Sequence, residues 1–219
     1  MAEINFKWIA GQEGHRNYGV LPKISDKGRE SGLTIGTGID LAYHTEADLR
    51  AAGVLEEDIK NSLPWLGSPG SPGPRGSQIM TKGSPYDAAV RVNGKKVEGT
   101  GKLIWDDQSL INMHEHLMKK SIKNAKRVYE NLTQKPNSFD RLTSAQQTVL
   151  VDLTYNGGAS FIYETIDLQA AIRNEDWDEI EKEFASKDWA EKDIPRHNDR
   201  ARLLSDERDE LYKKALITQ

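Results

Sequence analysis

A glycine-rich segment at residues 31–40 constrains the fold of this chain more than any other stretch. It reads Ser-Gly-Leu-Thr-Ile-Gly-Thr-Gly-Ile-Asp and holds three glycines, two threonines and one carboxylate in ten positions. Glycine inside a strand marks a tight bend or a close approach to the backbone. We therefore expect Gly36 and Gly38 to let a strand turn. Together with the turn residues upstream, the segment predicts a small antiparallel sheet across residues 18–40.

An acid precedes this segment. Glu13 lies near the end of a stretch predicted to be helical over residues 3–14, with Gly14 as the stop signal. An acid on a helix, followed by a turn with a hydroxyl and a second carboxylate, suits glycoside hydrolysis: one group protonates the leaving oxygen, and the other acts on a water or the sugar cation. Burial against Trp8 or Tyr18 would raise the pKa of Glu13, as a general acid requires. The alternative is a solvated glutamate at a helix end.

Three blocks of the sequence resemble one enzyme family. Glu13 followed by Thr34-Ile-Gly-x-Gly resembles the phage lysozymes of the T4 type. Asp40, six positions after Thr34, is placed as in the lysozyme-like domain of bacterial toxins of the pesticin kind. Residues 144–161 are similar to the central helix of the family, and residues 188–202 to its arginine-rich C-terminal signature. The blocks follow the family order and bracket nearly the whole chain.

The resemblance implies an α+β, lysozyme-like fold with a small N-terminal α/β lobe, a larger helical lobe and a cleft between them. It implies hydrolysis, without a cofactor, of the β-1,4 bond between N-acetylmuramic acid and N-acetylglucosamine in peptidoglycan. A phage endolysin, a virion-borne lysozyme and a delivered antibacterial toxin are all compatible with it. The alternative is a non-catalytic glycan-binding or interaction module that keeps the fold.

The second carboxylate is expected to be Asp40. It would act as a general base toward water or as an electrostatic partner of the developing sugar cation. The alternative is a structural aspartate that caps a helix or a turn. Asp26 is the rival, because it is the only aspartate between Glu13 and Thr34.

The resemblance also implies supporting residues. Thr34 would hold the attacking water, although a strand threonine is the plain alternative, and Thr37 is close enough to compete for this role. Gly36 and Gly38 would leave room for a sugar ring. Arg200 or Arg202 would reach back to Glu13 and orient its carboxyl group, and surface arginines are the alternative.

Composition limits the classes of function. The chain has 219 residues, no cysteine and a formal net charge of −4, which argues against disulfides, thiolate chemistry and general nucleic-acid binding. No N-terminal apolar signal or bilayer-length run is visible. We expect a monomer that is made in the cytoplasm and acts on cell-wall glycan strands in the periplasm, without inserting into a membrane. A delivery system, a holin or an immunity protein would be its partners.

The remaining helices and loops are predicted from hydrophobic periodicity and from the positions of glycine and proline. A single domain over residues 1–219 is expected, with residues 67–101 as an insertion made of a Pro/Gly/Ser loop (67–77) and a hairpin (90–97, turning at Asn93-Gly94). Helices are predicted at residues 45–52, 56–63, 103–131, 144–155, 168–174, 177–185 and 200–216, with Gly157-Gly158 ending the fourth. No metal site is expected, because His114 and His116 are two residues apart and point to different faces of a helix.

Overall fold

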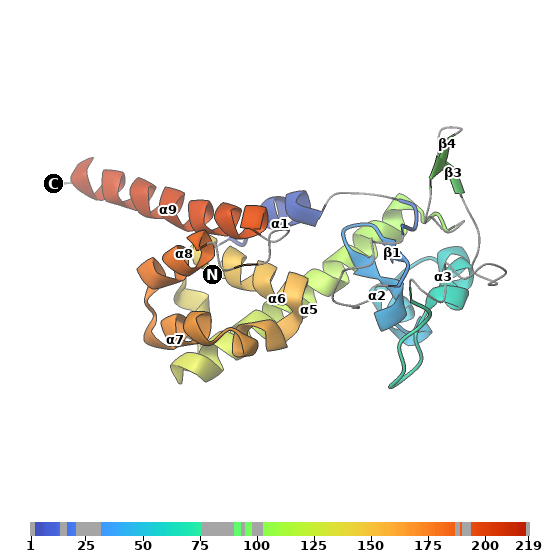
Figure 1. Ribbon diagram of the computed structural model, residues 1–219, viewed down its shortest axis with the longest axis horizontal. Coiled ribbons are helices and arrows are strands. Elements are labelled where there is room, and N and C mark those ends of the chain that lie inside the picture. Colours follow the sequence, from blue (N-terminus) through green and yellow to red (C-terminus); the bar gives the residue numbers. More distant parts are fainter. Residues whose placement is uncertain are drawn as a thin grey trace. The chain divides into compact units, whose positions relative to one another are not determined.

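The structure is a computed structural model that describes residues 3–13, 17–20, 32–75, 90–92, 95–97, 103–186, 189 and 194–217. The described chain is mostly helical with small antiparallel strand pairs, which agrees with the α+β class (Figure 1). It divides into two compact units. Residues 13–116 form the first, called here the N-terminal unit. Residues 1–12 and 117–219 form the second, called the helical unit.

A tight hairpin lies in the N-terminal unit. Strand β1 (Thr34–Ile35) pairs antiparallel with β2 (Ile39–Asp40), with Thr34 opposite Asp40 and Ile35 opposite Ile39. The two isoleucines are almost fully buried and anchor one face of the hairpin. Gly36 and Gly38 have φ values of 63° and 88°, in a region that L-residues with a Cβ avoid. The predicted turn at these two glycines is confirmed, as is the antiparallel pairing at residues 34–40, to which a bridge between Val20 and Thr34 is added. Residues 21–31 of the predicted sheet lie outside the described residues.

Short helices follow the hairpin. After the 3-10 turn η1 (Leu41–Tyr43) come α2 (Glu46–Ala52), α3 (Glu56–Ser62) and the 3-10 turn η2 (Leu63–Trp65). Thr45 and Asp48 form a reciprocal capping box at the start of α2, and Gly53 ends it with φ 79°. Both helices lie where the sequence predicts them.

Buried polar contacts join α3 to the start of α5 (Asp107–Thr133). Asp58 Oδ2 accepts hydrogen bonds from Ser109 Oγ at 2.6 Å and from the Asp106 backbone N–H at 3.0 Å. Trp105 Nε1 donates to Ser62 Oγ at 2.9 Å. Helix α5 starts after Asp106, whose carboxylate accepts the Gln108 N–H at 2.8 Å, and not at Leu103 as predicted.

The predicted insertion is described in part. Residues 67–75 contain no helix or strand, only a bridge between Ser68 and Ser71, and lie inside the N-terminal unit. Strands β3 (Val90–Val92) and β4 (Lys95–Val97) pair antiparallel, which confirms the hairpin. Its turn residues 93–94 and loop residues 76–77 lie outside the described residues.

The helical unit packs around one apolar core. Its elements are α1 (Phe6–Glu13, up to residue 12), the rest of α5, the 3-10 turn η3 (Phe139–Arg141), α6 (Ser144–Glu164), α7 (Ile166–Asn174), α8 (Trp177–Ala185) and α9 (Ile194–Ile217). Asn5 starts α1 by accepting the Trp8 N–H at 3.0 Å, so this helix begins later than predicted. Ile9 is fully buried in the core.

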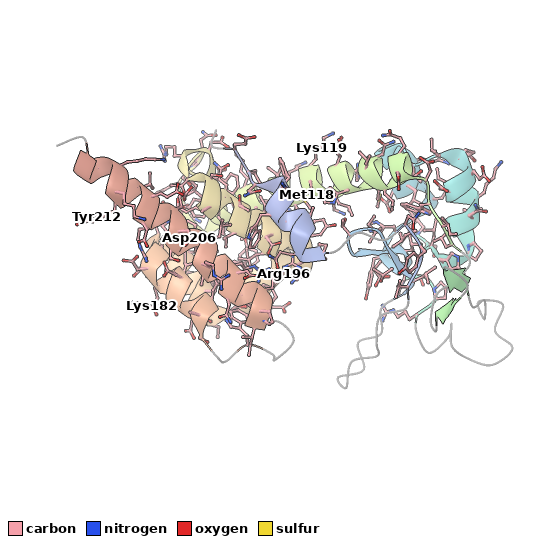
Figure 2. The ribbon with its side chains drawn as sticks, turned by 90° about the horizontal axis from the view of Figure 1, so that it is seen from above. Met118, Lys119, Lys182, Arg196, Asp206 and Tyr212 are labelled. Carbon is pink, nitrogen blue, oxygen red and sulfur yellow. The ribbon has the colours of Figure 1, made fainter. Side chains whose placement is uncertain are left out.

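Two helix predictions in this unit need correction. Gly157-Gly158 does not end α6. Gly158 adopts φ 72° and ψ 173°, which kinks the helix, and helical structure resumes to Glu164. Helix α9 begins at Ile194, ahead of the predicted residue 200. Figure 2 shows α9 with Arg196 near its start and Tyr212, which is 67% exposed, toward its end.

No helix in the described parts of the chain is both long enough and apolar enough to cross a membrane.

A buried histidine lies among aromatic rings in the helical unit. His197 on α9 is 2% exposed. Its ring stacks on Trp189, with centroids 3.8 Å apart and planes 16° apart, and on Phe184 at 5.6 Å. Burial, and then the positive charges of Arg200 and Arg196, lower the pKa of His197 to about 3. The core therefore holds this imidazole in its neutral form.

This histidine should make stability depend on pH. Between about pH 6.5 and pH 3 the unfolded chain binds a proton that the folded chain excludes, so the free energy of unfolding falls as the pH is lowered. One such group contributes up to about 1.4 kcal/mol per pH unit. His197→Phe, which keeps a ring in the stack, and His197→Gln, which keeps an acceptor for Arg200, should both flatten this dependence. Chemical denaturation followed by circular dichroism from pH 4 to 7 measures it, and parallel curves for wild type and both variants would contradict the assignment.

Candidate functional site

The structure brings Glu13 against the turn of the hairpin. Glu13 is the last residue of α1 and is partly buried, with Oε1 shielded from solvent. A Cβ atom added to Gly38 would lie 2.8 Å from Glu13 Oε2. Real Cβ atoms do not approach a neighbour so closely. Gly38 therefore provides a positive φ and also leaves the space that the carboxylate occupies, so that a side chain at this position would displace the end of Glu13.

Asp40 is held by backbone N–H groups. Its Oδ1 accepts hydrogen bonds from Ala42 and Gly32, both at 3.1 Å, and its Oδ2 lies 3.2 Å from the Gly32 nitrogen. The side chain caps η1, which is the structural role named as an alternative for this residue. Burial raises the pKa of the Asp40 carboxyl group, and the Ala42 and Gly32 N–H groups and the charge of Arg75 partly oppose that rise.

Thr34 shares a face of the hairpin with Asp40, because directly opposed residues of antiparallel strands point to the same side. Its hydroxyl lies 3.4 Å from the Gly32 carbonyl oxygen, a long contact for a hydrogen bond. Its backbone exchanges hydrogen bonds with Val20 at 2.7 and 2.8 Å. Thr34 is thus a strand residue with a weakly engaged hydroxyl.

Thr37 lies at the tip of the turn and is largely buried. Its Oγ1 is 2.9 Å from Nδ1 of His114, which lies on α5. This contact joins the tip of the hairpin to α5, through a residue 77 positions away in the sequence.

Arg200 is fully buried and binds Asp152 in the helical unit. Its Nε and Nη2 lie 2.8 and 2.7 Å from Asp152 Oδ2, and Arg196 Nη2 lies 2.5 Å from the other carboxylate oxygen. Arg202 is 71% exposed and lies 3.7 Å from Asp199. The role expected of Arg200 or Arg202 in orienting Glu13 stays a prediction.

The rival carboxylate, Asp26, lies outside the described residues, as does His15 beside Glu13. Within the described ranges, no group of three or more His, Asp or Glu side chains is arranged to hold a metal ion.

Three residues that contact or act on predicted site residues were missed by the sequence analysis. His114 was considered only as a metal ligand, and Asp152 was taken only as part of a buried helix. Arg75 lies with its guanidinium carbon 5.4 Å from the centre of the Tyr43 ring, and it acts on Asp40. Arg75 is the only charged residue in residues 67–77. A lone charge in a Pro/Gly/Ser segment was the one feature of the sequence that could have drawn attention to Arg75.

No protein-family model and no curated protein sequence matches this chain. What the site can do must therefore be inferred from its groups. Two carboxyl groups, Glu13 and Asp40, and two hydroxyls, Thr34 and Thr37, belong to one short hairpin and the helix end beside it. Such groups can donate and accept protons and can hold a water molecule.

The fit between Gly38 and Glu13 can be tested with a matched pair of variants. Gly38→Ala and Gly70→Ala both place a Cβ at positive φ, 88° and 80°, but only the first has a neighbour within 4 Å. Both should lose about 1–2 kcal/mol of stability to backbone strain. Only Gly38→Ala should displace the Glu13 carboxyl group, detected as a changed ¹³C resonance of that group. An unchanged Glu13 resonance in Gly38→Ala would show that the carboxylate does not lie against the turn.

Proposed function

We propose that this protein is a muramidase, a glycoside hydrolase that cleaves the β-1,4 bond between N-acetylmuramic acid and N-acetylglucosamine in peptidoglycan. The observation that carries the proposal is the approach of the Glu13 carboxylate to Gly38, in the turn of the hairpin that bears Thr34 and Asp40. A glycine at this point keeps the backbone from pushing the carboxylate away.

Glu13 is the proposed general acid. It would give its proton to the glycosidic oxygen as the bond to the sugar breaks. Its position at a helix end against the turn of the hairpin supports a carboxyl group that is held in one place.

Asp40 is the proposed second carboxylate, acting on water or on the developing positive charge of the sugar. Its raised pKa supports this role, because a more basic carboxylate takes a proton from water more readily. Thr34, on the same face of the hairpin and with a weakly engaged hydroxyl, is the proposed holder of that water.

The setting of this activity is part of the proposal. The fold would be lysozyme-like, with the substrate in a cleft between two lobes. The protein would work as a monomer, without a cofactor, on cell-wall glycan strands outside the cytoplasm. Release by a holin, carriage in a virion and delivery as a toxin are three routes to that target.

A second candidate is a glycan-binding module without catalytic activity. The observation that favours it is the engagement of Asp40 by the N–H groups of Gly32 and Ala42. A carboxylate that holds a turn in place has a structural task, and that task alone explains its presence.

Glu13→Gln separates the two candidates. The amide has the size of the acid but cannot donate the proton, so hydrolysis should fall by about 10²–10⁴ or more. The measurement is the release of muropeptides with new reducing ends from purified peptidoglycan. Binding to the same peptidoglycan should persist, because the variant keeps the shape of the site. An active Glu13→Gln protein would remove the assignment, and products with intact glycan chains but cleaved peptides would place the protein in another enzyme class.

Asp40→Asn and Asp26→Asn identify the second carboxylate. We expect Asp40→Asn to lose most activity and Asp26→Asn to keep it, because Asp26 stands in a sequence typical of an exposed turn. Asp40 also holds backbone groups, so the unfolding free energy of each variant must be measured beside its activity. If Asp40→Asn loses activity only in proportion to its unfolded fraction, the residue is structural. Loss of activity in Asp26→Asn alone would transfer the role to that residue.

A further inference from the structure

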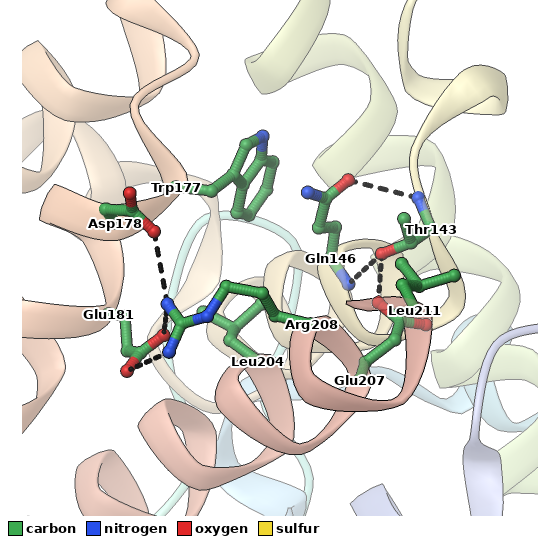
Figure 3. A pocket seen from close by; sticks show the side chains of 9 residues that line it. All are labelled: Thr143, Gln146, Trp177, Asp178, Glu181, Leu204, Glu207, Arg208 and Leu211. Atoms are coloured by element: carbon green, nitrogen blue, oxygen red, sulfur yellow. Dashed lines mark hydrogen bonds and ion pairs between the residues drawn. The ribbon is translucent and has the colours of Figure 1, made fainter. Parts of the chain in front are cut away.

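A pocket of about 160 Å³ opens in the helical unit, away from every residue assigned above (Figure 3). Three helices supply its walls: α6 at its first turn, α8 at its start and α9 from Leu204 to Leu211. The lining residues are Thr143, Gln146, Trp177, Asp178, Glu181, Leu204, Glu207, Arg208 and Leu211. Its volume is below the roughly 300–1,000 Å³ of pockets for drug-sized ligands, so one small ring fits it better than a long chain.

Part of the lining is apolar. The Trp177 ring lies 6.3 Å from the ring of the core residue Tyr129, which holds the indole in place. Leu204 is 7% exposed, whereas Leu211 at the rim is 50% exposed. The pocket therefore offers a fixed aromatic ring and an open rim to the carbon-bound hydrogens of a ligand.

The charged groups of the lining already contact neighbouring groups in the absence of a ligand. Arg208 Nη1 binds Asp178 at 3.1 Å and Glu181 at 2.7 Å. Glu207 accepts hydrogen bonds from the Thr143 hydroxyl and from the Ala145 N–H at the start of α6. Figure 3 shows the contacts of Arg208 with Asp178 and Glu181 and the contact of Thr143 with Glu207. Side chains that are already ordered lose little conformational entropy when a ligand binds.

Gln146 supplies a donor. Its Oε1 accepts the Thr143 N–H at 3.0 Å as part of a capping box, which fixes the amide group. Among the contacts of the described residues, none engages the Gln146 Nε2 hydrogens. In Figure 3 this nitrogen points toward Trp177, so a ligand that lies on the indole would meet an N–H donor.

Charge selects the class of ligand. Three carboxylates and one guanidinium line the pocket, a formal balance of −2 from Asp178, Glu181, Glu207 and Arg208. Phosphates and carboxylates would be repelled. A purely apolar ligand would cover the Gln146 Nε2 donor without giving it a hydrogen-bond partner. A neutral ring with hydroxyl groups on its edge and C–H groups on its face satisfies both parts of the lining.

We propose that this pocket binds one neutral sugar ring of a glycan, of the N-acetylglucosamine type. The indole of Trp177 stacks on the face of the ring, and Gln146 and the carboxylates bind its hydroxyl and amide groups. The site uses no residue assigned to hydrolysis, so it holds a glycan whether or not Glu13 cleaves it.

The test uses the full chain and the trimer of β-1,4-linked N-acetylglucosamine. Titration of ¹⁵N-labelled protein should shift the indole signal of Trp177, identified by its loss in Trp177→Phe. Trigalacturonic acid, an anionic trimer, should leave that signal in place. The Glu13→Gln protein should give the same Trp177 titration as wild type, which separates this proposal from the proposed hydrolysis.

Gln146→Glu is the decisive variant. Its carboxylate still accepts the Thr143 N–H, so the capping box and the fold should be kept, but the N–H donors are gone. Affinity measured at Trp177 should fall by about ten-fold, as expected for a lost hydrogen bond. Gln169→Glu, the same change on α7 outside the pocket, should bind like wild type. An indole signal that does not respond to the neutral trimer, or a Gln146→Glu protein that binds as well as Gln169→Glu, would overturn the proposal.

Discussion

A single buried carboxylate ties the helical unit together. Asp152 on α6 is fully buried and binds Arg196 and Arg200, both from the first turns of α9. Removing one partner of a buried ion pair leaves a charge without compensation and costs about 3–5 kcal/mol. The two ion pairs of Asp152 therefore fix where α9 begins to pack on α6. Through Arg200, which contacts His197 at 3.0 Å, they also fix the aromatic stack beside it.

In the N-terminal unit, the hairpin combines a structural task with a chemical one at the same atoms. Burial makes Asp40 a stronger base, while the N–H groups that hold it favour its charged form. A side chain in this balance is well ordered, as a proton acceptor must be if it is to meet a water molecule in a fixed place. Because the carboxylate oxygens of Asp40 already accept hydrogen bonds from Gly32 and Ala42, they keep few lone pairs for a water molecule. The competing proposals of a hydrolase and of a binding module differ over which of these two effects dominates.

Local signals in the sequence predicted local structure well. The capping box of Thr45, the stop at Gly53 and the bounds of α8 depend on residues within a turn of one another, so they can be read from spacing alone. The approach of Glu13 to the hairpin was predicted through resemblance. The pairing of Asp152 with Arg200 and of Thr37 with His114 was not predicted, because each joins residues that are 48 or 77 positions apart. Gly158 was predicted to end a helix, yet the helix continues beyond it to Glu164. The glycine was correctly predicted to interrupt the helical backbone, but the return to helix after Gly158 could not be predicted from local propensity.

The stack of Trp189 on His197 gives the protein an optical consequence. A protonated imidazole in contact with an indole quenches its fluorescence, whereas a neutral imidazole does so weakly. With the rings 3.8 Å apart and His197 held neutral by burial, we expect protonation of this imidazole to dim the emission of Trp189. Its intensity is therefore a native probe for the opening of this part of the core in mildly acidic surroundings, with no dye or label attached.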